Sequence, residues 1–418
     1  MKNCFYSANI MLPDWKKVDG TKWAVIACDQ HTSEPEYWEK AKEIADNSPS
    51  TLDLILPEVY LEETEKRVPL INKTMDSYLK NVLVEHKDSM IYVERTQSDG
   101  EIRRGLVGMI DLECYDYHKG AAALVRATEG TVLDRIPPRV AVRRGAPIEL
   151  PHVMILIDDP DKTVIEPHIN ACQGYEKAYD FDLMLGGGHI KGWFVNGFGK
   201  TKISAALQKL AAPEEMLKKY GDNYAPLLFA VGDGNHSLAS AKAAYEEVKT
   251  RIGDAALSHP SRYALAEIVN LHDESLKFEP IYRVMFGVSP VAVLAALGEY
   301  AENLEGTEKP QTVDYIHAGG EGSLVFRRPS AQLTVGTLQS FIDDYVSAHE
   351  GASVDYIHGV EATRALSKKE NAIGFIFDGM EKNQLFKTVI CDGALPRKTF
   401  SMGHAADKRY YLECRKIK

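Results

Sequence analysis

The 418-residue sequence predicts a mixed α/β (α+β) fold, because short apolar runs alternate with segments of helical periodicity along its whole length. The clearest instance is the apolar run 227–231, which stops at a Gly-Asp-Gly-Asn turn and leads into an alanine-rich helix at 238–247. A hairpin is a second instance, since residues 90–96 and 102–112 flank an Asp-Gly pair that suits a tight turn. Hydrophobic residues make up 44% of the chain, which is an ordinary value for a globular protein with a substantial core.

The remaining elements follow the same alternation. Apolar stretches predict buried strands, and apolar positions three and four residues apart predict helices. We expect strands at residues 23–28, 153–157, 183–188, 190–195, 263–271, 278–285, 323–327 and 373–378, and helices at residues 60–84, 202–220, 290–302 and 335–348. The polar segment 302–311, marked by Gly and Pro, is the best internal boundary or insertion.

The composition limits the classes of function. A net charge of −11 weighs against nucleic-acid binding, because phosphate backbones are held by an excess of Lys and Arg. The six cysteines are scattered, form no Cys-x-x-Cys pair and are interpreted as reduced thiols of a cytoplasmic protein. No apolar run reaches membrane-spanning length and the N-terminus has no signal-peptide core, so no membrane partner is expected.

The turn at residues 232–237, Gly-Asp-Gly-Asn-His-Ser, is the first candidate site. A strand followed by a sharp turn and a helix N-terminus presents free backbone N–H groups and the positive end of a helix dipole. Here these groups lie beside the carboxylate of Asp233 and the imidazole of His236, which suits binding of phosphate and chemistry next to it. The alternative is an ordinary helix cap with turn glycines.

An arginine-rich stretch is the second candidate. Arg126 and Arg135 lie near Glu129, and arginines around one carboxylate suit anion binding while keeping a base deprotonated. A solvated basic face with a capping threonine is the alternative. Residues 396–404 repeat the combination of basic and hydroxyl groups in a turn-rich segment, for which the alternative is an ordinary loop.

Several common catalytic signatures are missing from the sequence. Gly199-Lys200-Thr201 lacks the glycine that a P-loop needs five positions earlier, where Phe194 stands. The sequence has no His-Glu-x-x-His pair for zinc and no Gly-x-Ser-x-Gly nucleophile elbow.

Three short motifs, in this order, resemble the family called domain of unknown function 1015. They are Thr128-Glu129-Gly130-Thr131, Asp233-Gly234-Asn235-His236-Ser237 and Leu395-Pro396-Arg397-Lys398-Thr399. The resemblance covers about residues 20 to 415. The same elements also resemble the free-serine kinases, which implies a catalytic core of the ParB/sulfiredoxin-like fold with additional α/β elaborations.

The second resemblance implies roles for individual residues. Glu129 would be the general base for a hydroxyl group. Asp233 and His236 would act beside the transferred phosphoryl group, with Asp233 as the ligand of Mg²⁺. The phosphate and nucleotide would be bound by Gly232, Gly234, Asn235, Ser237, Arg126 and Arg135, and the substrate by Lys398, Thr399 and His404. The chain departs from the family pattern in the turn, where Asn235 replaces a histidine and Ser237 replaces an arginine that would bind phosphate with two hydrogen bonds.

These implications give the functional expectation. The chain would be a phosphotransferase that moves a phosphoryl group between ATP or ADP and a small hydroxy amino acid, serine or phosphoserine, with Mg²⁺. The expected regions are 1–120, an N-terminal α/β region, 121–300, the core with both motifs, and 301–418, a C-terminal region that closes the site. Homodimer formation stays open. The alternatives are a ParB-like nucleotide-switch or nucleic-acid-binding module, and a metabolite-binding protein without catalysis.

Overall fold

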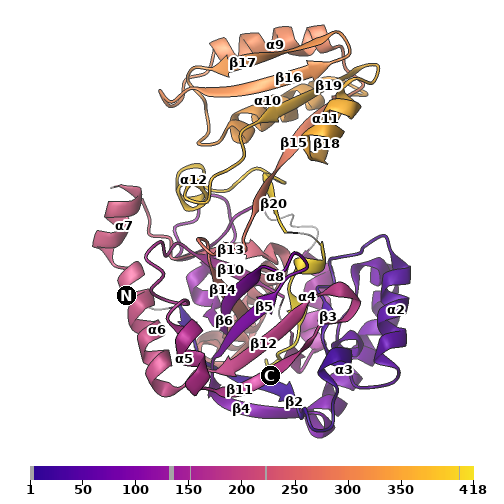
Figure 1. The fold of residues 1–418 in the computed structure, drawn as a ribbon, viewed down its shortest axis with the longest axis vertical. Helices are drawn as coiled ribbons and strands as arrows, with labels where there is room; N and C mark the ends of the chain where they lie inside the picture. Colours follow the sequence, from indigo (N-terminus) through magenta and orange to yellow (C-terminus); the bar gives the residue numbers. More distant parts are fainter. Residues whose placement is uncertain (1–3, 131–135, 151, 222–223, 404) are drawn as a thin grey trace. The chain divides into compact units, whose positions relative to one another are not determined.

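A computed structural model describes residues 4–130, 136–150, 152–221, 224–403 and 405–418, and confirms the mixed α/β class. The chain divides into two compact units, Met1–Leu276 with His404–Lys418, and Lys277–Gly403 (Figure 1). The first unit thus contains parts of all three regions expected from the sequence. The reason is that the end of the chain returns to the first unit as strands of two small sheets.

The first unit is built around a large sheet with the strand order β11-β12-β5-β6-β14-β10-β13-β8-β7, and β1 pairs with β6. The bounds of these strands are β1 (Phe5–Tyr6), β5 (Ile91–Thr96), β6 (Ile102–Asp111), β7 (Tyr115–Asp116), β8 (Val125–Ala127), β10 (Met154–Ile157), β11 (Glu176–Asp182), β12 (His189–Phe194), β13 (Phe229–Asp233) and β14 (Tyr263–Asn270). The predicted hairpin is confirmed as β5 and β6, with Thr96 opposite Ile102 across the Asp-Gly turn.

Three strand pairs and eight helices complete the described part of this unit. The pairs are β2 (Ala8–Pro13) with β4 (Leu83–Ser89), β3 (Val25–Ile26) with β21 (Tyr410–Tyr411), and β9 (Ile148–Glu149) with β22 (Arg415–Lys416). The helices are α1 (Gly20–Trp23), α2 (Pro35–Ala45), α3 (Thr64–Asn81), α4 (Ile136–Gly145), α5 (His168–Ala171), α6 (Gly197–Leu210), α7 (Pro213–Tyr220) and α8 (Asn235–Ile252). None of the described helices combines the length and the apolar character that crossing a bilayer requires.

Both faces of the large sheet are buried, because alternate residues of one strand enter different cores. In β5, Ile91 and Val93 pack into the core that contains α2 and α3, while Tyr92 packs into the core that contains α6 and α8. In β14, Leu265 and Ala266 divide in the same way. This two-sided burial explains why the strands are continuous apolar runs in the sequence.

Two element predictions are corrected by the structure. Residues 183–188, predicted as a strand, include the short 3-10 helix Met184–Gly186, and β12 pairs instead with β11, which lies earlier in the chain. The helix predicted at 202–220 is two helices, α6 and α7, because Pro213 lacks the N–H that a continuous helix needs and begins α7.

The second unit contains a sheet with the order β17-β16-β19-β15-β18, and β20 pairs with β15. Its elements are β15 (Phe278–Phe286), α9 (Pro290–Glu302), β16 (Gln311–His317), β17 (Gly320–Phe326), α10 (Thr334–Ala348), β18 (Ser353–His358), α11 (Val360–Ser367), β19 (Ala372–Phe377), α12 (Gln384–Asp392) and β20 (Phe400–Met402). The segment predicted as a boundary, 302–311, connects α9 to β16 inside this unit.

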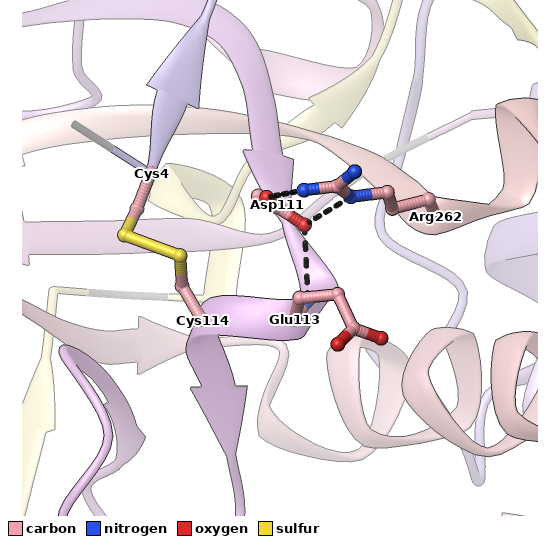
Figure 2. Close-up of a disulfide and its surroundings, with 5 residues drawn as sticks. All are labelled: Cys4, Asp111, Glu113, Cys114 and Arg262. Carbon is pink, nitrogen blue, oxygen red and sulfur yellow. Dashed lines mark hydrogen bonds and ion pairs between the residues drawn. A yellow bond between two sulfur atoms is a disulfide. The ribbon is translucent and has the colours of Figure 1, made fainter. Parts of the chain in front are cut away.

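A disulfide joins Cys4 to Cys114, so the expectation of six reduced thiols is wrong for this pair (Figure 2). Pairing of β1 with β6 brings the start of the described chain to the end of β6, and the two Cα atoms lie 6.1 Å apart. Close by, Arg262 donates two hydrogen bonds to the carboxylate of Asp111 (Figure 2). The scattered positions in the sequence concealed a pair that only the strand register brings together.

Candidate functional site

Two of the three sequence motifs meet because their strands are parallel neighbours. Strand β8 pairs with β13, with Val125 opposite Phe229 and Ala127 opposite Val231. The residues that follow β8, Thr128 and Glu129, therefore lie at the same edge of the sheet as the turn that follows β13. The motifs are about a hundred residues apart in the sequence, and the resemblance to free-serine kinases implied that they share one site; the pairing of β8 with β13 is what brings them together.

Helix α8 begins immediately after Gly234, whose positive φ of 79° is a conformation that glycine adopts at little cost. A Cβ atom at this position would lie 3.1 Å from the Cα of Val153. Glycine offers no side chain to cap the helix, so the first N–H groups of α8 are presented toward the turn. The predicted helix N-terminus at the turn is confirmed.

The Asn235 side chain joins the two motifs. The backbone N–H of Thr128 donates to Asn235 Oδ1 at 3.3 Å, and Asn235 Nδ2 donates to Thr128 Oγ1 at 3.4 Å. Thr128 Oγ1 in turn donates to the carbonyl of Val231 at 2.6 Å. Asn235 was predicted to bind phosphate, and its amide here holds the end of β8 against the start of α8.

A polar pocket lies at this junction. It is lined by Asp29, Glu129, Gly130, Arg139, Asp233, Gly234, Asn235, His236 and Ser237. Three carboxylates, one guanidinium and one imidazole thus surround the N-terminus of α8. Lys408 adds a further cation, with Nζ 3.7 Å from Asp233 Oδ2.

The structure brings together six of the predicted residues, Glu129 and Asp233 to Ser237 without a break, in this one pocket. Gly232 precedes the pocket in β13 and is not among its described lining residues. Arg135 and His404 lie outside the described residues.

Arg126 was expected to bind phosphate, but it is not among the described residues that line the pocket. Its guanidinium is buried and donates hydrogen bonds to the carbonyls of Ala123, Ala225 and Pro226 at 2.8 to 2.9 Å. Burial lowers its pKa. Arg126 therefore fixes the connection before β13, and Arg139, which forms an ion pair with Glu58, is the arginine at the pocket.

An apolar cavity adjoins the polar pocket. Its apolar lining includes Leu54, Ile55, Leu56, Met75, Val142, Leu150, Leu238 and Leu265, and its polar lining includes Cys28, His152 and Tyr411. Ser237 and Arg139 line both spaces, so they stand between them. A ligand with an anionic end and an apolar body fits this combination.

A buried hydrogen-bond chain runs along the boundary. Ser237 Oγ lies 3.1 Å from His152 Nε2, and His152 Nδ1 lies 2.7 Å from the Tyr411 hydroxyl. Tyr411 also donates to Cys28 Sγ at 3.0 Å. Burial raises the pKa of the Cys28 thiol to about 12, so this sulfur stays protonated at neutral pH.

Asp29 remains ionised beside this chain. Burial opposes its charge, but attraction to the His152 imidazole when that ring is protonated, a hydrogen bond from Gln30 and the nearby Lys408 together outweigh burial and lower the pKa of Asp29. Its Oδ2 lies 3.7 Å from His152 Nε2.

The predicted substrate residues Lys398 and Thr399 belong to the second unit. Thr399 is buried and donates to the carbonyl of Pro396 at 2.7 Å, within its own turn. Lys398 Nζ lies 5.5 Å from the ring centre of Tyr356, which Arg283 and Arg397 also approach. Their predicted role in substrate binding stays a prediction.

Sequence reasoning missed four residues of the site, which are Asp29, His152, Lys408 and Tyr411. It placed Arg139 in the arginine-rich stretch but gave it no role of its own. Asp29 and His152 had a usable signal, since Asp29 follows the strand predicted at 23–28 and His152 precedes the one predicted at 153–157. Lys408 and Tyr411 had none, because only the pairing of β21 with β3 brings the end of the chain here.

The described residues contain no group of three or more His, Cys, Asp or Glu side chains arranged to hold a metal ion. Mg²⁺ at phosphate sites is commonly bound by one or two carboxylates together with phosphate oxygens and water. The carboxylate of Asp233 in the polar pocket is a suitable donor for such a site.

The comparisons with known proteins identify the family. The sequence model described as protein of unknown function (DUF1015) matches residues 13–385, and the chain belongs to this family. No curated protein sequence matches at a significant level.

Solved structures give weak similarities. A free serine kinase in complex with AMP has 12% identity and a TM-score of 0.38 over 74% of this chain and 91% of that chain. A conserved hypothetical protein from Pyrococcus furiosus has 12% identity and a TM-score of 0.35 over 74% and 94% of the two chains. SbnI from Staphylococcus aureus has 11% identity and a TM-score of 0.33 over 71% and 82%.

Proposed function

We propose that this protein is a phosphotransferase that moves a phosphoryl group between a nucleotide and the hydroxyl group of a small amino acid, serine. One observation carries the proposal. The N-terminus of α8 opens into a pocket that also contains three carboxylates, and an apolar cavity adjoins it. Phosphoryl transfer needs these parts: a phosphate site, a carboxylate for the hydroxyl proton and a place for the nucleoside.

The phosphate would bind at the helix N-terminus. The N–H groups of Asn235, His236 and Ser237 and the helix dipole attract an anion, and the side chains of Arg139 and Lys408 bring positive charge to the same place. Asp233 would hold Mg²⁺, which when bound offsets the charge of the phosphate oxygens. The nucleoside would enter the apolar cavity past Ser237 and Arg139.

Glu129 would accept the proton of the substrate hydroxyl. It lines the pocket across from the start of α8, on the segment that Asn235 fixes in place. Phosphoryl transfer asks mainly for positioning and charge stabilisation, and a single oriented carboxylate meets its need for a base.

The experiment is a two-way activity assay on the full chain. Serine with ATP or ADP and Mg²⁺, and separately phosphoserine with ADP or AMP, are followed by mass spectrometry for formation of phosphoserine or serine. Thermal unfolding with ATP, ADP, CTP, serine and phosphoserine identifies ligands independently of turnover, because a ligand that binds the native state raises its melting temperature. Formation of phosphoserine supports the proposal.

Two results would contradict the proposed phosphotransferase function and favour one of the alternatives. Stabilisation by serine without any transfer favours the metabolite-binding alternative, which is a specific rival because Ser237 stands where the resembling family pattern has a phosphate-binding arginine. Stabilisation by CTP together with binding of duplex DNA favours the nucleotide-switch alternative.

A further inference from the structure

Ser237 has the surroundings of a nucleophile. An activated serine needs a base within about 2.6–3.2 Å and a third group that orients the base. His152 Nε2 lies 3.1 Å from Ser237 Oγ, and the Tyr411 hydroxyl lies 2.7 Å from the other ring nitrogen. The imidazole is 4% exposed, so its two ring nitrogens are held by the protein.

The hydrogen-bond network assigns the tautomer of His152. The Tyr411 hydroxyl donates to Cys28 Sγ, and its oxygen accepts from the backbone N–H of Cys28 at 3.4 Å. With its hydroxyl proton directed to the sulfur, Tyr411 accepts from His152 Nδ1–H, and Nε2 is left as an acceptor for the Ser237 hydroxyl. This is the form in which an imidazole takes a proton from serine.

The surrounding groups suit the charges that would develop. Asp29 Oδ2, 3.7 Å from His152 Nε2, stabilises the imidazolium after proton transfer. Ser237 lies in the first turn of α8, so a phosphoryl group on its oxygen would sit at the positive end of the helix dipole. Ser237 also lines both the polar pocket and the apolar cavity, so a ligand that spans the two must pass it.

We propose that Ser237 is a catalytic nucleophile that carries the phosphoryl group between nucleotide and acceptor, with His152 as its base and Tyr411 as the residue that positions His152. The proposal rests on the proposed function for the phosphoryl donor. In the first step Ser237 Oγ bonds to the terminal phosphorus of the nucleotide, the bond from that phosphorus to the bridging oxygen breaks, and the nucleotide leaves with one phosphate fewer. The serine proton moves to His152 Nε2.

In the second step the acceptor hydroxyl attacks the phosphorus and the bond to Ser237 Oγ breaks. His152 returns its proton to Ser237, and Glu129 takes the proton of the acceptor. The sum of the two steps is transfer of one phosphoryl group and release of one proton. Ser237 stands where the resembling family pattern has an arginine. That arginine would only bind the phosphate, whereas Ser237 would carry it covalently.

A fluorophosphonate probe tests the nucleophile without a nucleotide, because it phosphonylates activated serines. We expect peptide mass spectrometry to find the label on Ser237 and to find none in Ser237→Ala. His152→Gln should slow labelling by about 10²–10⁴-fold, the range of a lost general base. Tyr411→Phe should lower the maximal labelling rate while leaving the half-saturating probe concentration unchanged, which a merely structural effect would not do.

The matched control is Ser261→Ala, whose hydroxyl also lies beside an imidazole, 2.8 Å from His259 Nδ1, and which is not among the described lining residues of the polar pocket or the apolar cavity. It should label as the unaltered chain does. Melting temperatures of all variants show that loss of label is not loss of fold. If the unaltered chain takes no label at Ser237, the nucleophile proposal is overturned.

Incubation with ATP and Mg²⁺ in the absence of acceptor tests the phosphoryl step. We expect a phosphoryl group on Ser237 that disappears when serine is added. Full phosphoserine production by Ser237→Ala would overturn this inference and leave the proposed function standing. Fluorophosphonate labelling of Ser237 with no transfer from any nucleotide would instead overturn the proposed function and keep Ser237 as the nucleophile.

Discussion

At the residue scale, Glu129 and Asp233 occupy one pocket, yet the structure gives them different neighbours. Asp233 ends β13 and has Lys408 nearby, whereas Glu129 follows β8 on a segment held by Asn235. The difference separates a group that would act on phosphate from one that would act on a hydroxyl proton. Conservative substitutions, which keep the shape and remove the charge, can distinguish the two.

For Glu129→Gln, we expect turnover to fall by about 10²–10⁴-fold with little change in nucleotide affinity, because a general base acts on the acceptor and not on the nucleotide. Turnover and nucleotide-induced thermal stabilisation are measured on the same preparation. Loss of both would make Glu129 part of the nucleotide site, and loss of neither would place the active site elsewhere.

For Asp233→Asn, we expect loss of phosphoryl transfer and a weaker response of nucleotide binding to Mg²⁺, with the melting temperature of the free chain nearly unchanged. The substitution is isosteric, and the turn keeps its backbone. Asp254→Asn, an exposed position, is the control. Full activity of Asp233→Asn would contradict its assignment to the phosphate site.

At the scale of the element, the start of α8 depends on the conformation of Gly234. Gly234→Ala would place a Cβ 3.1 Å from the Cα of Val153 and force φ of 79° on an L-residue. We expect a loss of about 1–2 kcal/mol in the free energy of unfolding, measured with urea. Gly197→Ala is the control, because a Cβ there meets no atom within 4 Å. Equal stability of the two variants would show that the turn adapts.

The C-terminal strand β22 is held by a buried ion pair that makes stability depend on pH. Burial raises the pKa of Glu149, but Arg143 and Arg415 outweigh it, and the net pKa is lowered. A lowered folded-state pKa contributes stability that is present above the unfolded value, about 4.3, and is lost as the pH falls through the folded value.

We therefore expect the urea midpoint to decrease below about pH 4.5 and this decrease to shrink in Glu149→Gln. The variant should also lose about 3–5 kcal/mol at pH 7, since the buried Arg415 and the half-buried Arg143 lose their partner. The urea midpoint is measured from unfolding curves at several pH values. The control is Glu85→Gln, which removes the more exposed ion pair with Lys416. An identical pH slope in Glu149→Gln and the unaltered chain would assign the acid sensitivity to other groups.

The elements of the site differ in how far the sequence predicts them. The turn, the helix start and the hairpin were predictable, because glycines, Asp-Gly and apolar runs determine them locally. The residues that surround the turn were not predictable. Asp29, His152 and Tyr411 lie there because of strand pairings between segments far apart in the chain. Arg126 is a residue that the sequence placed in the site and the structure does not. Its position in an arginine-rich stretch did not reveal that its guanidinium donates its hydrogen bonds to backbone carbonyls.

At the scale of the whole molecule, long-range connections decide the division of the chain. Composition predicted a boundary near residues 302–311, whereas the units separate after Leu276 and the chain returns to the first unit at His404. A polar segment marks a loop, but a domain boundary depends on which elements pack together, and that is a property of tertiary contacts. The Cys4–Cys114 pair is another such contact, and it carries a test of its own.

The Cys4–Cys114 bond spans 110 residues of sequence and should stabilise the first unit. Closing a loop of this size restricts the unfolded chain, and we expect oxidised protein to be about 4–5 kcal/mol more stable to urea than reduced protein. The double variant Cys4→Ser with Cys114→Ser should match the reduced protein, and Cys391→Ser should leave the difference intact.

Alkylation of the unfolded, unreduced chain followed by mass measurement reports the bond directly, with four modified cysteines expected in the oxidised form. Six modified cysteines, or equal stability with and without reductant, would mean that the bond does not form in solution. Because disulfides persist in oxidising surroundings, the same measurement on protein taken directly from a reducing cytosol decides whether the bond belongs to the working state. The polar pocket does not depend on that outcome, since neither cysteine lines it and the turn after β13 is held to the end of β8 by Asn235 and strand pairing.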